Sequence, residues 1–141
     1  MERIASSDDH SGREARISPV GLVLTLVIVE LTAVTAYLHL SLGGELFTLN
    51  GLGYLALGTA YAAAVLVPIP LVRRFAWLPR IGLATYTLVT IGAYLVLGPY
   101  YWIGWTAKGI EVAIVALLAA DLFLAYSPRR GLWRAAIAPR G

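Results

Sequence analysis

The 141-residue sequence contains no cysteine and very few charged side chains. Without cysteine there are no disulfides, thiolate metal sites or thiol redox chemistry. Charged residues make up 13% of the chain, against roughly 25% in typical soluble domains. All but one of the 11 basic residues are arginines, the exception being Lys108. This scarcity of charge argues against a soluble domain and against a nucleic-acid-binding surface.

Hydrophobic residues, by contrast, make up 59% of the sequence and gather in long apolar runs. A helix of about 20 residues crosses the roughly 30 Å hydrocarbon core of a bilayer, because it rises about 1.5 Å per residue. The sequence therefore predicts an integral membrane protein with four membrane-spanning helices, at about 19–42, 52–72, 81–103 and 109–126.

The predicted fold is an all-α, up-and-down bundle, because the short connections make successive helices antiparallel neighbours. Ser18 and Pro19 suit the N-cap and first turn of the first helix, and Asn50 suits the N-cap of the second. Residues 1–18 read as a polar arm and residues 127–141 as a basic tail.

The arginines predict the orientation in the cell membrane. All ten lie before the first predicted span, between the second and third, or after the fourth, whereas the only charged residues of the two opposite connections are Glu45 and Lys108. Because cytoplasmic loops are enriched in arginine and lysine, both termini of this multi-pass protein are expected in the cytoplasm.

Two stretches carry a family resemblance: "GGELFTLNGLGYLAL" at 43–57 and "WTAKGIEVAIVALLAADL" at 105–122. With their Leu-Phe-x-Leu-Asn-x-Leu-Gly-Tyr connection and Lys-x-x-Glu helix start, they resemble small four-helix membrane proteins of bacteria and archaea that have no established activity. The resemblance implies a topology and no catalytic residues.

Glu30 stands in the middle of the first apolar run, "LTLVIVELTAVTAYLHL". Counting from Pro19 puts it about 16 Å deep, near the bilayer centre, where a charge is costly. We expect Glu30 to face the bundle interior as a neutral acid and to hydrogen-bond Tyr61 or Thr90, which depth counting puts in the same plane. A structural and a proton-coupled role both remain open.

A second set of polar residues lies near the opposite, outer ends of the predicted spans. Lys108 and Glu111 are three apart on one helix, so we expect them to pair. A hydrogen-bonded histidine at the interface is a simpler reading of His39 than a metal or haem ligand, since no recognised ligand pattern or second bundle histidine accompanies it. No metal and no cofactor are expected. The outer set is His39, Asn50, Tyr54, Lys108 and Glu111.

Asp121, near the cytoplasmic end of the last span, is expected to pair with Arg129, Arg130 or an arginine of the 73–80 loop. Small residues on the second and third predicted helices permit close helix packing: Gly51, Gly58, Ala62, Gly82, Gly92 and Gly98.

The sequence contains no nucleophile–base pair, phosphate loop or dinucleotide fingerprint. The leading functional hypothesis is therefore non-enzymatic: a small integral subunit that associates with itself or with a larger membrane complex. One alternative is an oligomeric transporter or channel for protons or small solutes that uses Glu30. Another is a quinone- or haem-linked redox protein that uses His39.

The topology is testable because the chain has no cysteine of its own. Single cysteines at Ser7 and Thr48 should react oppositely with an impermeant thiol reagent added outside intact cells. We expect labelling at position 48 only. Labelling at position 7 and not at 48 would show an inverted orientation.

Overall fold

The computed structural model describes residues 18–98 and 100–126, and its regular structure there is helical throughout. It contains five helices in chain order: α1 (Pro19–Leu42), α2 (Glu45–Leu66), α3 (Pro70–Arg74), α4 (Trp77–Leu97) and α5 (Trp102–Tyr126). Four of them, all except the short α3, are long and apolar enough to cross a membrane. The predicted all-α class with four such helices is confirmed.

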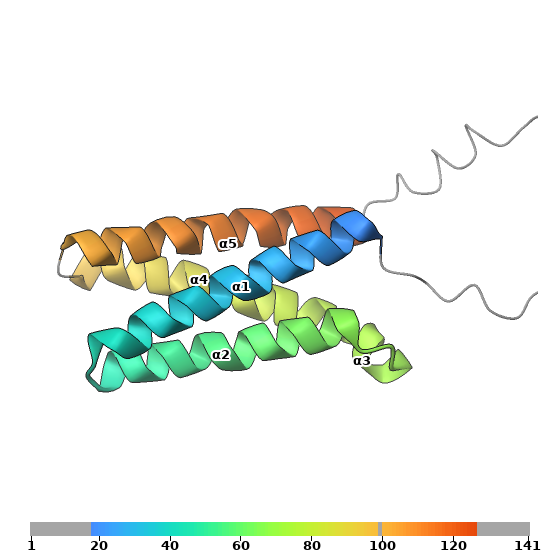
Figure 1. Ribbon diagram of the computed structural model, residues 1–141, viewed down its shortest axis with the longest axis horizontal. Helices are drawn as coiled ribbons and strands as arrows, with labels where there is room; N and C mark the ends of the chain where they lie inside the picture. Colours follow the sequence, from blue (N-terminus) through green and yellow to red (C-terminus); the bar gives the residue numbers. More distant parts are fainter. Residues whose placement is uncertain (1–17, 99, 127–141) are drawn as a thin grey trace, which may run out of the picture.

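The four long helices run alternately up and down (Figure 1). They form a closed ring, because α1 packs on α2 and α5, and α4 also packs on α2 and α5. The start of α1, the whole of α3 and the end of α5 lie at one end, which we call the arginine end after Arg73 and Arg74 of α3. The α1–α2 and α4–α5 connections lie at the other, the turn end.

Helix α1 has the bounds predicted from its capping signals. The Ser18 hydroxyl accepts a hydrogen bond from the Gly21 amide at 3.1 Å, and Pro19 occupies the first turn, where no backbone donor is needed. The helix ends at Gly43 and Gly44, which have φ angles of 70° and 85°. Only glycine adopts this region freely, so the pair makes the tight turn into α2.

Helix α2 begins seven residues earlier than the predicted start at 52, because the glycine turn ends directly before Glu45. Asn50 is therefore inside the helix, and its predicted role as N-cap is wrong. The predicted end at 72 is also wrong. Pro68 disfavours the helical region for the preceding Val67, which is extended, and α2 stops at Leu66.

Helices α4 and α5 both start before their predicted positions. α4 begins at Trp77 and not at 81, since Pro79 is tolerated in a first turn. It ends at Leu97, where the extended Gly98 precedes a proline, and not at 103. α5 begins at Trp102 and not at 109. Tyr100 and Tyr101, which were predicted inside the third helix, thus belong to the connection, and Trp102 is the first residue of α5.

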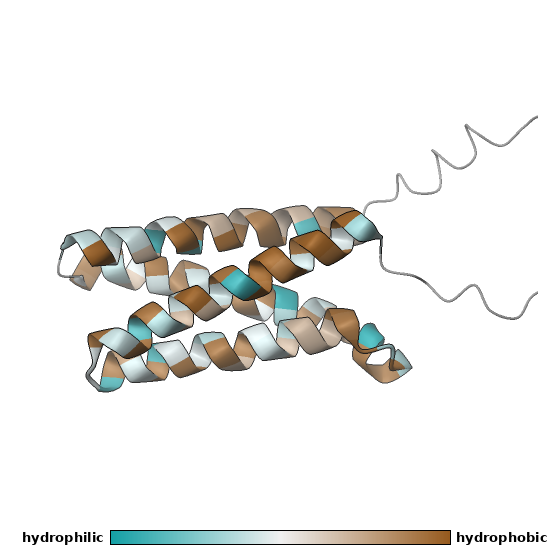
Figure 2. Cartoon of the chain, viewed as in Figure 1, coloured by the Kyte–Doolittle hydropathy of each residue, from teal (hydrophilic) through white to brown (hydrophobic). Residues whose placement is uncertain are grey.

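The surface of the bundle is apolar and its interior contains charges. Figure 2 shows brown over most of the four long helices, and large hydrophobic side chains are exposed on every one of them. Trp102 is 86% exposed and Tyr100 62% exposed at the turn end. Such aromatic residues suit a membrane–water interface. The charged and polar side chains buried inside are Thr25, Thr32, Thr35, His39, Arg80, Thr87, Lys108, Glu111 and Asp121.

Close packing between α1 and α2 depends on glycine. A Cβ atom added at Gly51 would lie 3.0 Å from the Ala36 carbonyl oxygen and 2.7 Å from Leu40 Cγ. One added at Gly58 would lie 2.8 Å from Thr32 Cγ2. These glycines let the two backbones approach, as small residues do between membrane helices.

Replacing Gly51 by valine should therefore destabilise the bundle by about 1–3 kcal/mol, the usual cost of overpacking. Gly92→Val is the control, because an added Cβ there meets nothing within 4 Å. Thermal unfolding in detergent should show a lower Tm for Gly51→Val than for Gly92→Val. Equal Tm values would mean that the α1–α2 contact has little part in stability.

Candidate functional site

Near the arginine end, one buried carboxylate joins three helices. Asp121 of α5 accepts hydrogen bonds on Oδ2 from Arg80 Nε of α4 at 2.7 Å and from the Tyr61 hydroxyl of α2 at 3.1 Å. Arg80 also donates to the Ala76 carbonyl, and its guanidinium lies 5.6 Å from the centre of the Tyr61 ring. We call Arg80, Asp121 and Tyr61 the arginine triad; its two opposite charges neutralise each other.

The triad confirms the expectation that Asp121 pairs with an arginine of the 73–80 segment. The alternative partners, Arg129 and Arg130, lie outside the described residues. Arg80, however, was expected in an interfacial loop, whereas it is 6% exposed in the first turn of α4. The earlier start of α4 explains this difference.

Nearer the turn end, Lys108 and Glu111 of α5 form the ion pair predicted from their spacing. Lys108 Nζ lies 2.7 Å from Glu111 Oε1 and 2.5 Å from Oε2, and 3.3 Å from the Thr90 carbonyl oxygen of α4. Glu111 is fully buried and Lys108 is 7% exposed. The predicted pair is therefore present, and it lies inside the bundle.

Thr90 extends this pair into a chain of hydrogen bonds. Its hydroxyl lies 3.0 Å from Glu111 Oε2, 2.8 Å from the Thr87 carbonyl and 2.8 Å from the Tyr54 hydroxyl of α2. A hydroxyl has a single hydrogen to donate, and both the carbonyl and the carboxylate can only accept. Tyr54 must therefore be the donor to Thr90. We call Tyr54, Thr90, Lys108, Glu111 and His39 the outer cluster.

His39 completes the outer cluster from α1. Its Nδ1 lies 2.8 Å from the Thr35 carbonyl oxygen, which can only accept, so Nδ1 carries a hydrogen. Nε2 lies 3.6 Å from Glu111 Oε1. In the neutral ring Nε2 is an acceptor, whereas in the protonated ring it pairs with Glu111. The imidazole is buried, with the residue 4% exposed, so it is not the headgroup-facing side chain expected from the sequence.

Glu30 is not where the sequence placed it. It is exposed on the outer surface of α1 and faces away from the bundle interior. Its two expected partners contact other acids: Tyr61 donates to Asp121, and Thr90 donates to Glu111. The predicted grouping of Glu30 with Tyr61 and Thr90 is wrong. The buried side of α1 is the one that carries Thr25, Thr32, Thr35 and His39, and Glu30 lies on the opposite side of the helix.

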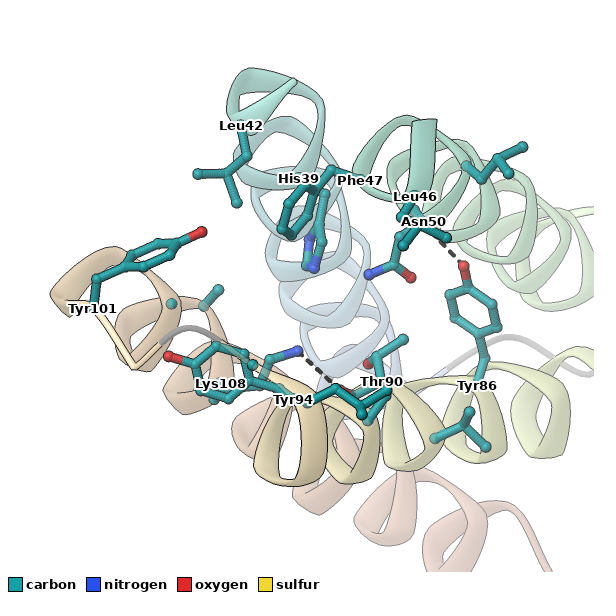
Figure 3. A pocket seen from close by; sticks show the side chains of 17 residues that line it. His39, Leu42, Leu46, Phe47, Asn50, Tyr86, Thr90, Tyr94, Tyr101 and Lys108 are labelled. Atoms are coloured by element: carbon teal, nitrogen blue, oxygen red, sulfur yellow. Dashed lines mark hydrogen bonds between the residues drawn. The ribbon is translucent and has the colours of Figure 1, made fainter. Parts of the chain in front are cut away.

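Beside the outer cluster lies a pocket of about 580 Å³ (Figure 3). Asn50 of α2 lines it together with His39 and Lys108, and the other two outer polar residues, Tyr54 and Glu111, hydrogen-bond to Thr90, which also lines it. The Tyr86 hydroxyl donates to the Asn50 backbone carbonyl at 3.2 Å and closes one side. The spacing of Tyr86, Thr90 and Tyr94 by four residues places them on one helix face, but the sequence did not show that this face forms one wall of a pocket. The aromatic walls are Phe47, Tyr86, Tyr94 and Tyr101.

The arrangement suits binding and hydrogen bonding more than metal chemistry. Within residues 18–98 and 100–126, no group of three His, Cys, Asp or Glu side chains could hold a metal ion. The only imidazole there is that of His39, whose Nδ1 is already bonded to Thr35. What the outer cluster offers instead is a neutralised ion pair and an imidazole acceptor at the wall of an apolar pocket.

Comparisons with family models, with curated proteins and with solved structures find no match to this chain. The resemblance noted for residues 43–57 and 105–122 is thus not supported by a matching family.

Removing the cation of the outer cluster should be strongly destabilising. Lys108→Met leaves the buried Glu111 without its counter-charge, and breaking a buried pair in this way costs about 3–5 kcal/mol. The double variant Lys108→Met/Glu111→Gln removes both charges and keeps an acceptor for Thr90. Its Tm in detergent should recover most of the loss. If the double variant unfolds as early as the single one, the loss comes from packing of the lysine and not from charge.

Proposed function

We propose that this chain is an integral membrane protein with cytoplasmic termini, and that it works as a non-enzymatic subunit of a larger membrane complex. It would attach to its partner through the outer face of α1. The single observation behind this proposal is the exposure of Glu30 halfway along the helix.

Glu30 interrupts an otherwise apolar surface. Its neighbours one turn away on α1, Leu26, Val27 and Ala33, are exposed as well. If the helix spans a bilayer, this face meets hydrocarbon at the depth where a charge costs about 2.5–3.5 kcal/mol or more. A partner that supplies a polar or charged group at that depth removes the cost, so contact with another helix is favoured there.

The chemistry of the partner follows from charge complementarity. In the described part of the chain, the cations inside the long helices are Arg80 and Lys108, and both are buried against their own carboxylates. The other two, Arg73 and Arg74, lie in α3 at the arginine end. A second copy of the chain therefore brings no cation to the depth of Glu30. We infer a different membrane protein with a lysine or arginine in the middle of one span.

The orientation within this proposal follows from the same arginines. Arg73 and Arg74 lie at the end of the bundle where α1 begins and α5 ends. By the positive-inside tendency this end faces the cytoplasm, so the turn end with its aromatic side chains faces the outside.

A photo-crosslinking residue at Ala33 tests the partner in native membranes. Ala33 is exposed one turn from Glu30, and the matched control is Leu88, exposed near the middle of α4. We expect a crosslinked product from position 33 and not from 88, with a mass that differs from multiples of the 15.2 kDa chain. Glu30→Leu should abolish it and Glu30→Asp should retain it.

The decisive step is charge exchange with the crosslinked partner. Glu30→Lys should lose the complex, and replacing the partner's basic residue by glutamate should restore it. Products that are only multiples of the chain mass would assign this face to self-association through two carboxyl groups that share a proton. Crosslinking that Glu30→Leu leaves unchanged would refute any role of Glu30 in assembly.

A further inference from the structure

We propose that the pocket beside the outer cluster binds a neutral, lipid-soluble ring compound with carbonyl or hydroxyl groups, of the quinone or quinol class. This inference depends on insertion of the bundle in a bilayer. It does not depend on the partner proposed for Glu30, which lies on a different face.

The shape of the pocket favours a ligand that arrives from the lipid. A volume of about 580 Å³ lies within the usual range of about 300–1,000 Å³ for small-molecule sites. Its edge is formed by Leu46 and Leu49 of α2 and by Val89 and Leu97 of α4, which are 62–83% exposed. The pocket thus opens sideways between α2 and α4, where acyl chains would lie, and an isoprenoid or alkyl tail can remain outside.

The walls of the pocket favour a flat ring. His39 and Phe47 lie on one side, from α1 and α2, and Tyr94 and Tyr101 lie across from them (Figure 3). Planar rings pack well against such side chains in edge-on or offset geometry. Most other lining residues are leucine, alanine, valine or glycine, so the surroundings of the ring are apolar.

The charge state of the pocket favours a neutral ligand. Lys108 is the one basic side chain other than His39 among the lining residues, and both carboxylate oxygens of Glu111 engage its ammonium group. Its other contacts are with the Thr90 carbonyl and with the Tyr94 ring, whose centre lies 5.4 Å from Nζ. An acidic ligand would have to displace Glu111, which is buried and could not then be solvated.

The hydrogen-bonding groups that remain match a carbonyl and a hydroxyl. Figure 3 shows the Asn50 amide and the His39 ring directed into the space. The amide NH₂ can donate to a ligand carbonyl, and the Nε2 acceptor of neutral His39 can receive a ligand hydroxyl. The two residues belong to adjacent helices, so one ring can contact both.

The test uses the full chain in lipid nanodiscs and a short-chain prenylated benzoquinol, with the matching quinone and oleate as comparison probes. We expect saturable binding of the quinol or the quinone by calorimetry, at one site per chain. Asn50→Leu should weaken it about threefold to tenfold, the effect of one neutral hydrogen bond. His39→Gln should weaken the quinol more than the quinone, because the quinol alone carries hydroxyl donors.

A pair of filling variants separates this pocket from general partition into lipid. Ala93→Phe places a ring in the pocket, whereas Ala116→Phe adds the same ring on the exposed face of α5. Binding should be lost in the first and kept in the second, with both variants folded by circular dichroism. Saturable binding of oleate alone would assign the site to acidic lipids and overturn the proposal. Absence of saturable quinol and quinone binding, or equal binding in the two filling variants, would overturn it too.

Discussion

Two buried carboxylates set the register of α5 against α4, and the rest of the bundle is arranged around them. Asp121 meets Arg80, and Glu111 meets Thr90. The two contacts are ten residues apart on each helix, or about 15 Å along antiparallel axes, so they fit one register only. A slip of one helical turn would break both contacts at once. It would leave Arg80 and Asp121 unpaired in an apolar interior, at several kcal/mol each, whereas Glu111 would keep Lys108, its neighbour on the same helix.

The same two carboxylates connect α2 to this pair of helices. Tyr61 donates to Asp121 directly, and Tyr54 reaches Glu111 through Thr90. The two tyrosines are seven residues apart, two turns on one face of α2. In a bilayer the surrounding lipid is as apolar as leucine, so hydrophobic burial gives helices little reason to associate. Polar links of this kind, together with the glycine contacts between α1 and α2, then decide which faces meet.

The sequence predicted the helices better than it predicted their rotation. Length and composition were enough to predict four helices that are long and apolar enough to cross a membrane. Local spacing was enough to predict the Lys108–Glu111 pair, because residues three apart on a helix are neighbours. The rotation of α1 was different. Thr25, Thr32, Thr35 and His39 share one face of this helix, and that face is buried. The prediction instead placed the single acid of the apolar run, Glu30, on the inside. For an isolated chain in a bilayer, an acid inside the bundle costs less free energy than an acid facing lipid. Glu30 is nevertheless exposed.

Helix ends were missed for a related reason. The first connection was predicted at 43–51, although the turn at Gly43 and Gly44 is enough, and the last was predicted at 104–108, whereas α4 ends at Leu97 and α5 begins at Trp102. The sequence limited the partner of Asp121 to a few arginines but did not select Arg80 among them, because that choice depends on where α4 begins. A hydrogen bond between distant residues, such as Tyr54–Thr90, can be predicted only when the axial alignment of α2 and α4 is known. A single sequence does not give that alignment.

Glu30 and the mouth of the pocket lie on two separate sides of the ring. Glu30 is on α1, whereas the mouth of the pocket is formed by exposed residues of α2 and α4. α1 packs on α2 and α5 and is diagonal to α4. A helix docked over Glu30 therefore leaves the gap between α2 and α4 free. His39 links the two sides: it lies nine residues after Glu30 on α1, and its ring lines the pocket. If both proposals hold, a shift of α1 caused by a docked partner would move the imidazole relative to Glu111, and α1 would be the helix that couples attachment to ligand binding.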